Sequence, residues 1–203
     1  MGNLTNLLLL AIGAAFVMQL ISPEFENLLI FDPAVALSQP WRFVSSIFLH
    51  GGVTHIFFNS YALFMFGSLL ERRVSWKDYL IIFFGAGILG SFSYYSTYLL
   101  GIIPPIPALG ASGAIYGILG AVAMILPDLQ IFVFFFPMKM RYAVIFWLAL
   151  TFLGAFDVSS GVADAAHLGG LVFGIICGWL LSRKPPEFYQ PAWEHDRGPP
   201  VYA

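Results

Sequence analysis

The sequence predicts an all-α membrane protein with six spanning helices and both termini in the cytoplasm. Composition is the first observation behind this prediction, because 59% of the 203 residues are hydrophobic and only 10% are charged. Soluble domains carry roughly 25% charged residues, so a soluble globular fold and a disordered chain are both excluded. About 120 hydrophobic residues allow up to about six spans of about 20 residues each, with little left for a soluble domain.

Apolar runs and the breakers between them are the second observation, and they define the spans in order. The first run lacks a basic n-region and an A-x-A cleavage site, so it is expected to be a retained span and not a signal peptide. A long, more polar loop over residues 22–54 follows it. The six spans are expected at about residues 4–21, 55–70, 79–100, 111–126, 140–156 and 163–181.

Charges or prolines end the later spans, and a hydrophobic connection broken by proline joins the fourth span to the fifth. This organisation predicts a six-span unit over residues 1–182 and a proline-rich, disordered cytoplasmic tail over residues 183–203. The single cysteine, Cys177, excludes an intrachain disulfide and a Cys-x-x-Cys site.

The distribution of basic residues is the third observation. Eight of the nine fall in the tail or in the loops after the second and fourth spans, and only Arg42 falls on the other side. By the positive-inside rule, both termini are therefore cytoplasmic and the loops after spans one, three and five are outside. The eight are Arg72, Arg73, Lys77, Lys139, Arg141, Arg183, Lys184 and Arg197.

Polar side chains within the spans are expected to mark function, because they are costly inside a bilayer. His55 and Asn59 lie in the second span, Ser112 in the fourth and His167 in the sixth. All three spans run inward, and each of these residues lies about 12–16 positions from the inner end of its span. At about 1.5 Å per residue, all four lie roughly 18–24 Å above the inner boundary, in the outer third of the membrane.

Glycines are spaced so that the fourth and sixth spans can pack closely. Gly170, Gly174 and a further glycine share the face of His167, and Gly113 and Gly117 form a G-x-x-x-G pattern in the fourth span. Such patterns let neighbouring helix backbones approach each other. Close packing would bring Ser112 within reach of His167.

These residues permit peptide-bond hydrolysis inside the membrane. A serine hydroxyl needs a base to become a nucleophile, and histidine is the usual one, so Ser112 is predicted as nucleophile and His167 as base and then acid. Ser112 lies in the first turn of its helix, where backbone N–H groups have no intrahelical partner. The Ser112 N–H, His55 and Asn59 are predicted to form the oxyanion hole.

Simpler interpretations exist for each residue. A serine at a helix start is commonly an N-cap, an intramembrane histidine can be a structural hydrogen-bonder, and G-x-x-x-G can be ordinary packing. Asp164 could orient His167 but fits a cap or loop residue better, so the site is predicted to be a dyad. A metal site on the histidines is excluded, because no H-E-x-x-H pattern and no carboxylate at that depth complete it.

Five motifs, in order along the chain, resemble those of the rhomboid intramembrane serine proteases in their basic six-span prokaryotic form. The resemblance runs from about Trp41 to Gly178 and is highly specific as a set. The motifs are Trp41-Arg42, the H-x-x-x-N of residues 55–59, the G-x-x-x-E of residues 67–71, the G-x-S-G of residues 110–113 with Tyr116, and the A-H-x-x-G-x-x-x-G of residues 166–174.

The resemblance implies a compact bundle around a water-filled cavity open to the outer face, with Ser112 at its floor. Tyr116 would pack on the His167 ring, Gly110, Gly113, Trp41 and Arg42 would support the site, and His50 would be structural. Span five and the loop before span six would act as gate and cap, with Phe58 as a gate contact.

The resemblance also implies the partners and the compartment. Substrates would be single-span membrane proteins in the lipid bilayer, cut near the outer face at small residues. No cofactor, metal or nucleic acid is expected, and the compartment would be a prokaryotic plasma membrane.

Two other functions compete with proteolysis. One is a catalytically silent, substrate-binding or chaperone-like relative, which the intact Ser112 and His167 disfavour. The other is a small transporter, which the lack of an inverted repeat or paired broken helices disfavours.

Overall fold

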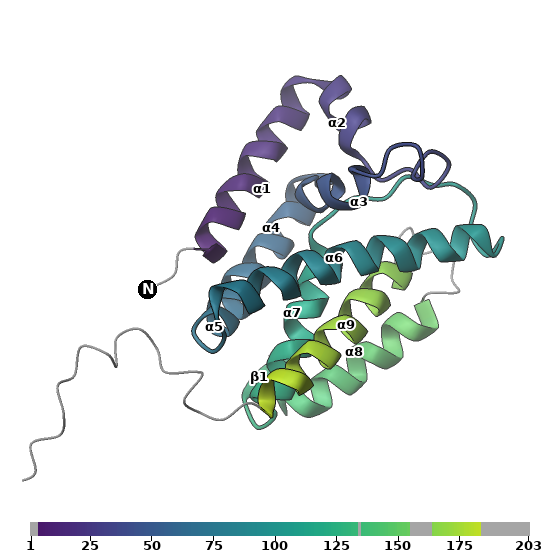
Figure 1. The fold of residues 1–203 in the computed structure, drawn as a ribbon. Helices are drawn as coiled ribbons and strands as arrows, with labels where there is room; N and C mark the ends of the chain where they lie inside the picture. Colours follow the sequence, from purple (N-terminus) through teal and green to yellow (C-terminus); the bar gives the residue numbers. More distant parts are fainter. Residues whose placement is uncertain (1–3, 134, 155–163, 184–203) are drawn as a thin grey trace, which may run out of the picture.

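The computed structural model describes residues 4–133, 135–154 and 164–183. In this part of the chain, four helical segments are long and apolar enough to cross a membrane, and α7 and α8 are shorter (Figure 1). The elements are α1 (Leu4–Ile21), α2 (Pro23–Leu29), α3 (Arg42–Ser45), α4 (Val53–Ala62), α5 (Ser68–Glu71), α6 (Trp76–Leu99), α7 (Ser112–Ile125), β1 (Gln130–Val133), β2 (Phe136–Lys139), α8 (Met140–Gly154) and α9 (Asp164–Ser182). The four long segments are α1, the continuous run Val53–Glu71, α6 and α9.

The expected spans coincide with helices, and the first has the predicted bounds. Span two is helical throughout but not α-helical throughout, because a π-helical turn, Leu63–Gly67, joins α4 to α5. Some predicted segments lie outside the described residues: residues 155–156 of span five, residues 157–162 of the cap, residue 163 of span six and residues 184–203 of the tail.

Most of the described residues are helical, as predicted, but one connection forms two short strands. Between α7 and α8 the chain forms an antiparallel ribbon of β1 and β2, in which Phe132 pairs with Pro137. Both strands of an isolated ribbon are edge strands, where proline is tolerated because its missing N–H is not needed by a further strand. The expected Pro-broken loop is therefore a hairpin.

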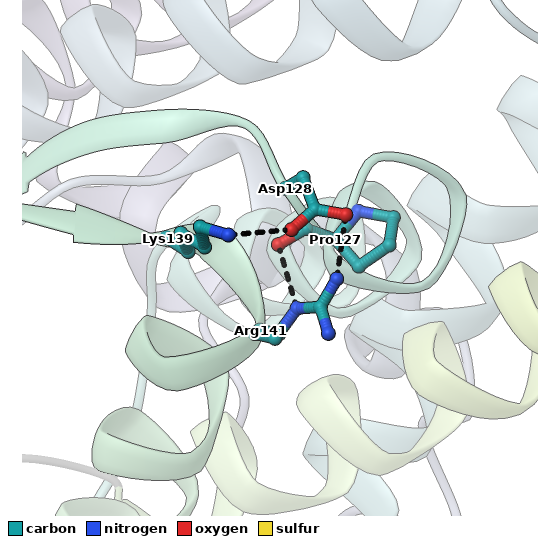
Figure 2. A network of polar contacts seen from close by, with 4 residues as sticks. All are labelled: Pro127, Asp128, Lys139 and Arg141. Atoms are coloured by element: carbon teal, nitrogen blue, oxygen red, sulfur yellow. Dashed lines mark hydrogen bonds and ion pairs between the residues drawn. The ribbon is translucent and has the colours of Figure 1, made fainter.

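The ends of this ribbon are held beside the end of α7 by Asp128, as Figure 2 shows. Its Oδ1 accepts a hydrogen bond from Lys139 Nζ at 3.0 Å, and its Oδ2 lies 2.6 Å from an Arg141 guanidinium nitrogen. The Lys139 hydrogen bond is the main reason that the pKa of Asp128 lies below its usual value. Because all three side chains are largely exposed, the ion pairs order the connection more than they stabilise the fold.

The centre of the bundle is α7, in which ten of 14 residues are buried. Helices α6, α8 and α9 and the π-helical turn surround it. By contrast, α1 buries only four of its 18 residues and lies at the edge of the bundle (Figure 1). The side chains of a helix that is buried on all sides must be apolar, and small ones let its neighbours pack closely. This explains the alanines, glycines and isoleucines of α7.

The N-terminal end of α1 is held by Glu71, the last residue of the G-x-x-x-E pattern. Its carboxylate accepts hydrogen bonds from the Leu4 N–H at 2.8 Å and from Thr5 Oγ1 at 2.7 Å. Thr5 Oγ1 also lies 2.8 Å from the Tyr79 hydroxyl. These contacts satisfy helix-end N–H groups that have no intrahelical partner and join α1 to α5 and α6.

The predicted loop of residues 22–54 contains two short helices, α2 and α3, and its last two residues begin α4. Ser22 caps α2, with its hydroxyl accepting from the Phe25 N–H at 3.2 Å. Trp41 Nε1 donates to the Leu28 carbonyl at 3.1 Å, and an Arg42 guanidinium N–H donates to the Ile30 carbonyl. Trp41 and Arg42 thus satisfy carbonyls at the end of α2, which otherwise have no partner.

Candidate active site

Ser112 and His167 meet at the N-terminal ends of α7 and α9. Ser112 Oγ lies 2.7 Å from His167 Nε2, and the His167 side chain is buried. Gly110, two residues earlier, has φ +130°, a conformation that glycine adopts without a steric penalty. This turn lets the chain begin α7 at Ser112, with the hydroxyl facing α9.

Glycines bring the two helices into backbone contact. A Cβ added at Gly170 would lie 2.0 Å from the Gly113 carbonyl oxygen, and one at Gly174 would lie 1.9 Å from the Gly117 carbonyl oxygen. No side chain can be accommodated at such distances, because the opposing atoms belong to the backbone. On its other side, an added Cβ at Gly117 would lie 2.1 Å from Ala86 Cβ of α6. The short distance between Ser112 and His167 depends on these contacts.

The His167 ring is held on two sides. Tyr116, one turn after Ser112, stacks on it with ring centroids 4.5 Å apart and planes at 10°. Asp164 begins α9, and its Oδ1 lies 3.4 Å from His167 Nδ1. The geometry of that pair does not make a hydrogen bond, and Nδ1 has no hydrogen-bond partner among the described residues. The structure therefore brings Asp164 closer to the ring than the sequence suggested.

His55 lies across from Ser112, beside Gly110. A Cβ added at Gly110 would lie 3.0 Å from His55 Nε2 and 3.7 Å from Ser112 Oγ. The His55 ring therefore packs against Gly110 where a side chain would not fit, and the missing side chain lets the ring lie near Ser112 Oγ. Asn59 is buried on the next turn of α4, where its Nδ2 donates to the His55 carbonyl at 2.9 Å. The second N–H of that amide is left for another acceptor.

A cavity opens next to Ser112, between α6, α7 and the first loop. Several small residues line it together with the polar side chains of Tyr94, Ser46 and Ser91. The lining residues are Phe31, Ser46, Ile47, Gly87, Ser91, Tyr94, Ala108, Leu109, Gly110, Ser112, Gly113 and Ala166.

Other predicted residues lie away from the hydroxyl. Trp41 and Arg42 hold the first loop, and Phe58 is exposed on α4. His50 is buried in the loop before α4, where burial and then the neighbouring His55 lower its pKa to about 4. The ring is therefore neutral at physiological pH. Within the described ranges, no group of three or more His, Cys, Asp or Glu side chains could hold a metal ion.

The sequence reasoning missed Gln19, a buried residue of α1. Its Oε1 accepts from the His50 N–H at 2.9 Å, and its Nε2 donates to the His50 carbonyl at 3.3 Å. An amide side chain in the last turn of a largely apolar span was the signal that could have identified it.

Comparison with known proteins identifies a matching family profile and several similar sequences. A profile of the rhomboid domain matches residues 37–184. The chain is 32% identical over 160 residues to YdcA of Bacillus subtilis, across 78% of this chain and 76% of YdcA. It is also 32% identical over 148 residues to the rhomboid protease GlpG of Haemophilus influenzae, across 72% of each chain. A third match, 32% over 166 residues, is to the rhomboid protease GluP of B. subtilis and spans 31% of that protein.

Proposed function

Because this chain belongs to the rhomboid family, we propose that it is an intramembrane serine endopeptidase with Ser112 as nucleophile and His167 as general base and then acid. The observation that carries the proposal is the 2.7 Å contact between Ser112 Oγ and His167 Nε2. That distance lies within the range in which a base can take the hydroxyl proton. The names of GlpG and GluP, both rhomboid proteases, support it further.

The proposed reaction proceeds through an acyl-enzyme. Ser112 Oγ attacks the scissile carbonyl carbon while its proton passes to His167 Nε2. The carbonyl oxygen becomes an oxyanion and accepts hydrogen bonds from the Ser112 N–H, His55 Nε2–H and Asn59. His167 then protonates the departing amine, and the C–N bond breaks. A water molecule, deprotonated by His167, hydrolyses the ester and restores the Ser112 hydroxyl.

The proposed setting is a six-span bundle over residues 1–182, with a cytoplasmic tail and the site opening toward the outer face of a bacterial plasma membrane. Six apolar helices and the one-sided distribution of basic residues support this topology. Substrates are single-span membrane proteins cut at small residues. The cavity beside Ser112 supports that preference, because the bulky side chains of Phe31, Ile47 and Tyr94 help to line it and limit the room for a substrate side chain.

A fluorophosphonate probe and a single-span reporter substrate test the proposal together. The purified wild type is expected to be labelled and to cleave the reporter, and Ser112→Ala is expected to lose both. Ser96→Ala is the matched control and should keep both, because within the described ranges its hydroxyl donates to the Phe92 carbonyl of its own helix. A folded wild type that is neither labelled nor active would overturn the proposal in favour of a catalytically silent relative.

Removal of the Asn59 amide is expected to slow cleavage by about 10²–10³-fold, the usual cost of losing one oxyanion donor. Labelling by the probe should be partly retained in Asn59→Ala, because Ser112 and His167 are untouched. Turnover of the reporter measures the effect. Asn6→Ala, an exposed asparagine of α1, is the control and should match the wild type. An unchanged rate in Asn59→Ala would remove this residue from the oxyanion hole.

Removal of the ring that stacks on His167 is expected to have a smaller effect. Tyr116→Phe keeps the stack and should cleave within about twofold of the wild type. Tyr116→Ala removes an aromatic contact of about 0.5–1.5 kcal/mol, so its rate should fall by about 2- to 12-fold. Steady-state kinetics on variants of matched melting temperature distinguish the two. Equal activity of both variants would show that the stack does not hold the histidine.

A further inference from the structure

Gln19 connects α1 to the segment that precedes His55, through an amide whose orientation is unambiguous. Its Nε2 donates to the His50 carbonyl at 3.3 Å and to Glu26 Oε2 at 2.9 Å, and its Oε1 accepts from the His50 N–H at 2.9 Å. A carbonyl and a carboxylate can only accept and an N–H can only donate, so the reversed amide would lose all three bonds. Gln19 therefore binds both polar backbone groups of His50.

The peptide unit after His50 in turn contacts the catalytic region. The Gly51 N–H donates to His55 Nδ1 at 3.3 Å. In a neutral imidazole one nitrogen accepts and the other carries the proton, so this bond puts the proton on Nε2. Nε2 lies on the edge of the ring that packs against Gly110, close to Ser112. A donor for the oxyanion is available there only in this tautomer.

We propose that Gln19 is a positioning residue for the oxyanion hole. By holding the His50 backbone from both sides, it keeps the Gly51 N–H directed at His55 Nδ1 and the Nε2–H of His55 directed at the substrate oxyanion. Glu26 of α2 completes the arrangement, because its carboxylate takes the remaining amide hydrogen of Gln19. This inference rests on the proposed function, since it concerns a donor that acts only when a peptide bond is attacked.

A merely structural role would also explain a buried glutamine. Gln19 could simply hold α1 against the first loop through its hydrogen bonds, which would stabilise the fold with no link to catalysis. The two roles differ in one respect. A positioning residue acts through His55, so its loss should matter little once the His55 ring is gone, whereas a structural defect should persist.

A double-mutant cycle between Gln19→Met and His55→Ala therefore tests the proposal. Methionine keeps the length of the side chain and removes its hydrogen bonds. In the reporter assay, Gln19→Met is expected to lower kcat about tenfold with KM within about twofold, because only a donor to the transition state is misdirected. In the His55→Ala background the same change should alter kcat by less than about twofold. Equal effects in both backgrounds would overturn the proposal.

Thr5→Val is the matched control on the same helix. Thr5 is also buried and bonds to Glu71 and Tyr79, but at the opposite end of α1 from His50. It should lower the melting temperature and act independently of His55→Ala. If Thr5→Val were coupled to His55→Ala as strongly as Gln19→Met is, the coupling would be a property of the whole fold. That result would overturn the proposal.

Two further measurements keep the test decisive. If Gln19→Met does not fold, Glu26→Ala takes its place, because it leaves α1 intact and removes only the acceptor of one Gln19 amide hydrogen. Glu26→Ala should lower kcat about two- to threefold, and this effect should depend on His55 in the same way. No dependence on His55 in that variant would overturn the inference. A wild type that neither cleaves nor binds the probe would contradict the proposed function itself, whereas an active wild type matched by Gln19→Met would contradict only the role of Gln19.

Discussion

Replacing His167 with alanine is expected to lower the rate of reporter cleavage by roughly 10⁴-fold or more, while the protein remains folded. In a serine enzyme the loss of the base or of the nucleophile alone removes most of the catalysis that the pair supplies. Here Nε2 lies 2.7 Å from Ser112 Oγ, and the carboxylate of Asp164 lies on the side of the other ring nitrogen. Among the described residues, His167 is the base that is hydrogen-bonded to the hydroxyl. Single-turnover cleavage and probe labelling measure the loss.

Asp164→Asn is the control that separates a dyad from a triad. Asp164 Oδ1 is 3.4 Å from His167 Nδ1 but forms no hydrogen bond with it, so the amide should reduce cleavage by less than about tenfold. In a triad the same change costs about 10⁴-fold. A fall of that size would assign Asp164 a catalytic part. Full activity of His167→Ala would contradict the proposed mechanism altogether.

Much of the helical part of the fold could be predicted because the bilayer leaves few choices. A backbone in lipid must satisfy its own hydrogen bonds, so long apolar runs become helices, and the first run became α1 with the expected bounds. The prediction of a loop over residues 22–54 misses helix α2, which lies at the start of that range. Ser22 followed by Pro23 and Glu24 is instead a helix start, with an N-cap, a proline at the first position and an acidic first turn.

The site could be predicted only in part, for a different physical reason. Counting residues from the inner ends of the spans put Ser112 and His167 at one depth, and in the structure they are hydrogen-bonded; their catalytic roles stay predictions. A residue count gives height but no lateral direction. The contacts of Gln19 with His50 and of Asp164 with the His167 ring depend on how helices are rotated and on loop geometry, which apolar periodicity does not encode.

Substitution of Gly174 by alanine is expected to destabilise the bundle. It is also expected to abolish most of the activity, although Gly174 does not contact Ser112 or take part in the proposed reaction. An added Cβ would lie 1.9 Å from the Gly117 carbonyl oxygen and 2.5 Å from its carbonyl carbon. Because backbone atoms cannot rotate away, α9 must separate from α7, at a cost of about 1–3 kcal/mol or more. Any such separation lengthens the contact between Ser112 and His167, and misplacement by about 1 Å can cost about 10²-fold in rate.

The matched control for Gly174→Ala is Gly13→Ala, the same change in a helix that has room for it. Within the described residues nothing lies within 4 Å of a Cβ added at Gly13, and alanine favours a helix over glycine by roughly 1 kcal/mol in water. Gly13→Ala should therefore melt at or above the wild-type temperature and cleave normally, whereas Gly174→Ala should melt lower and lose at least about 10²-fold in kcat. Melting of both variants in the same detergent, followed by reporter kinetics, makes the comparison. If Gly174→Ala matched Gly13→Ala in both measurements, the backbone contact between α7 and α9 would not be what holds the serine against the histidine.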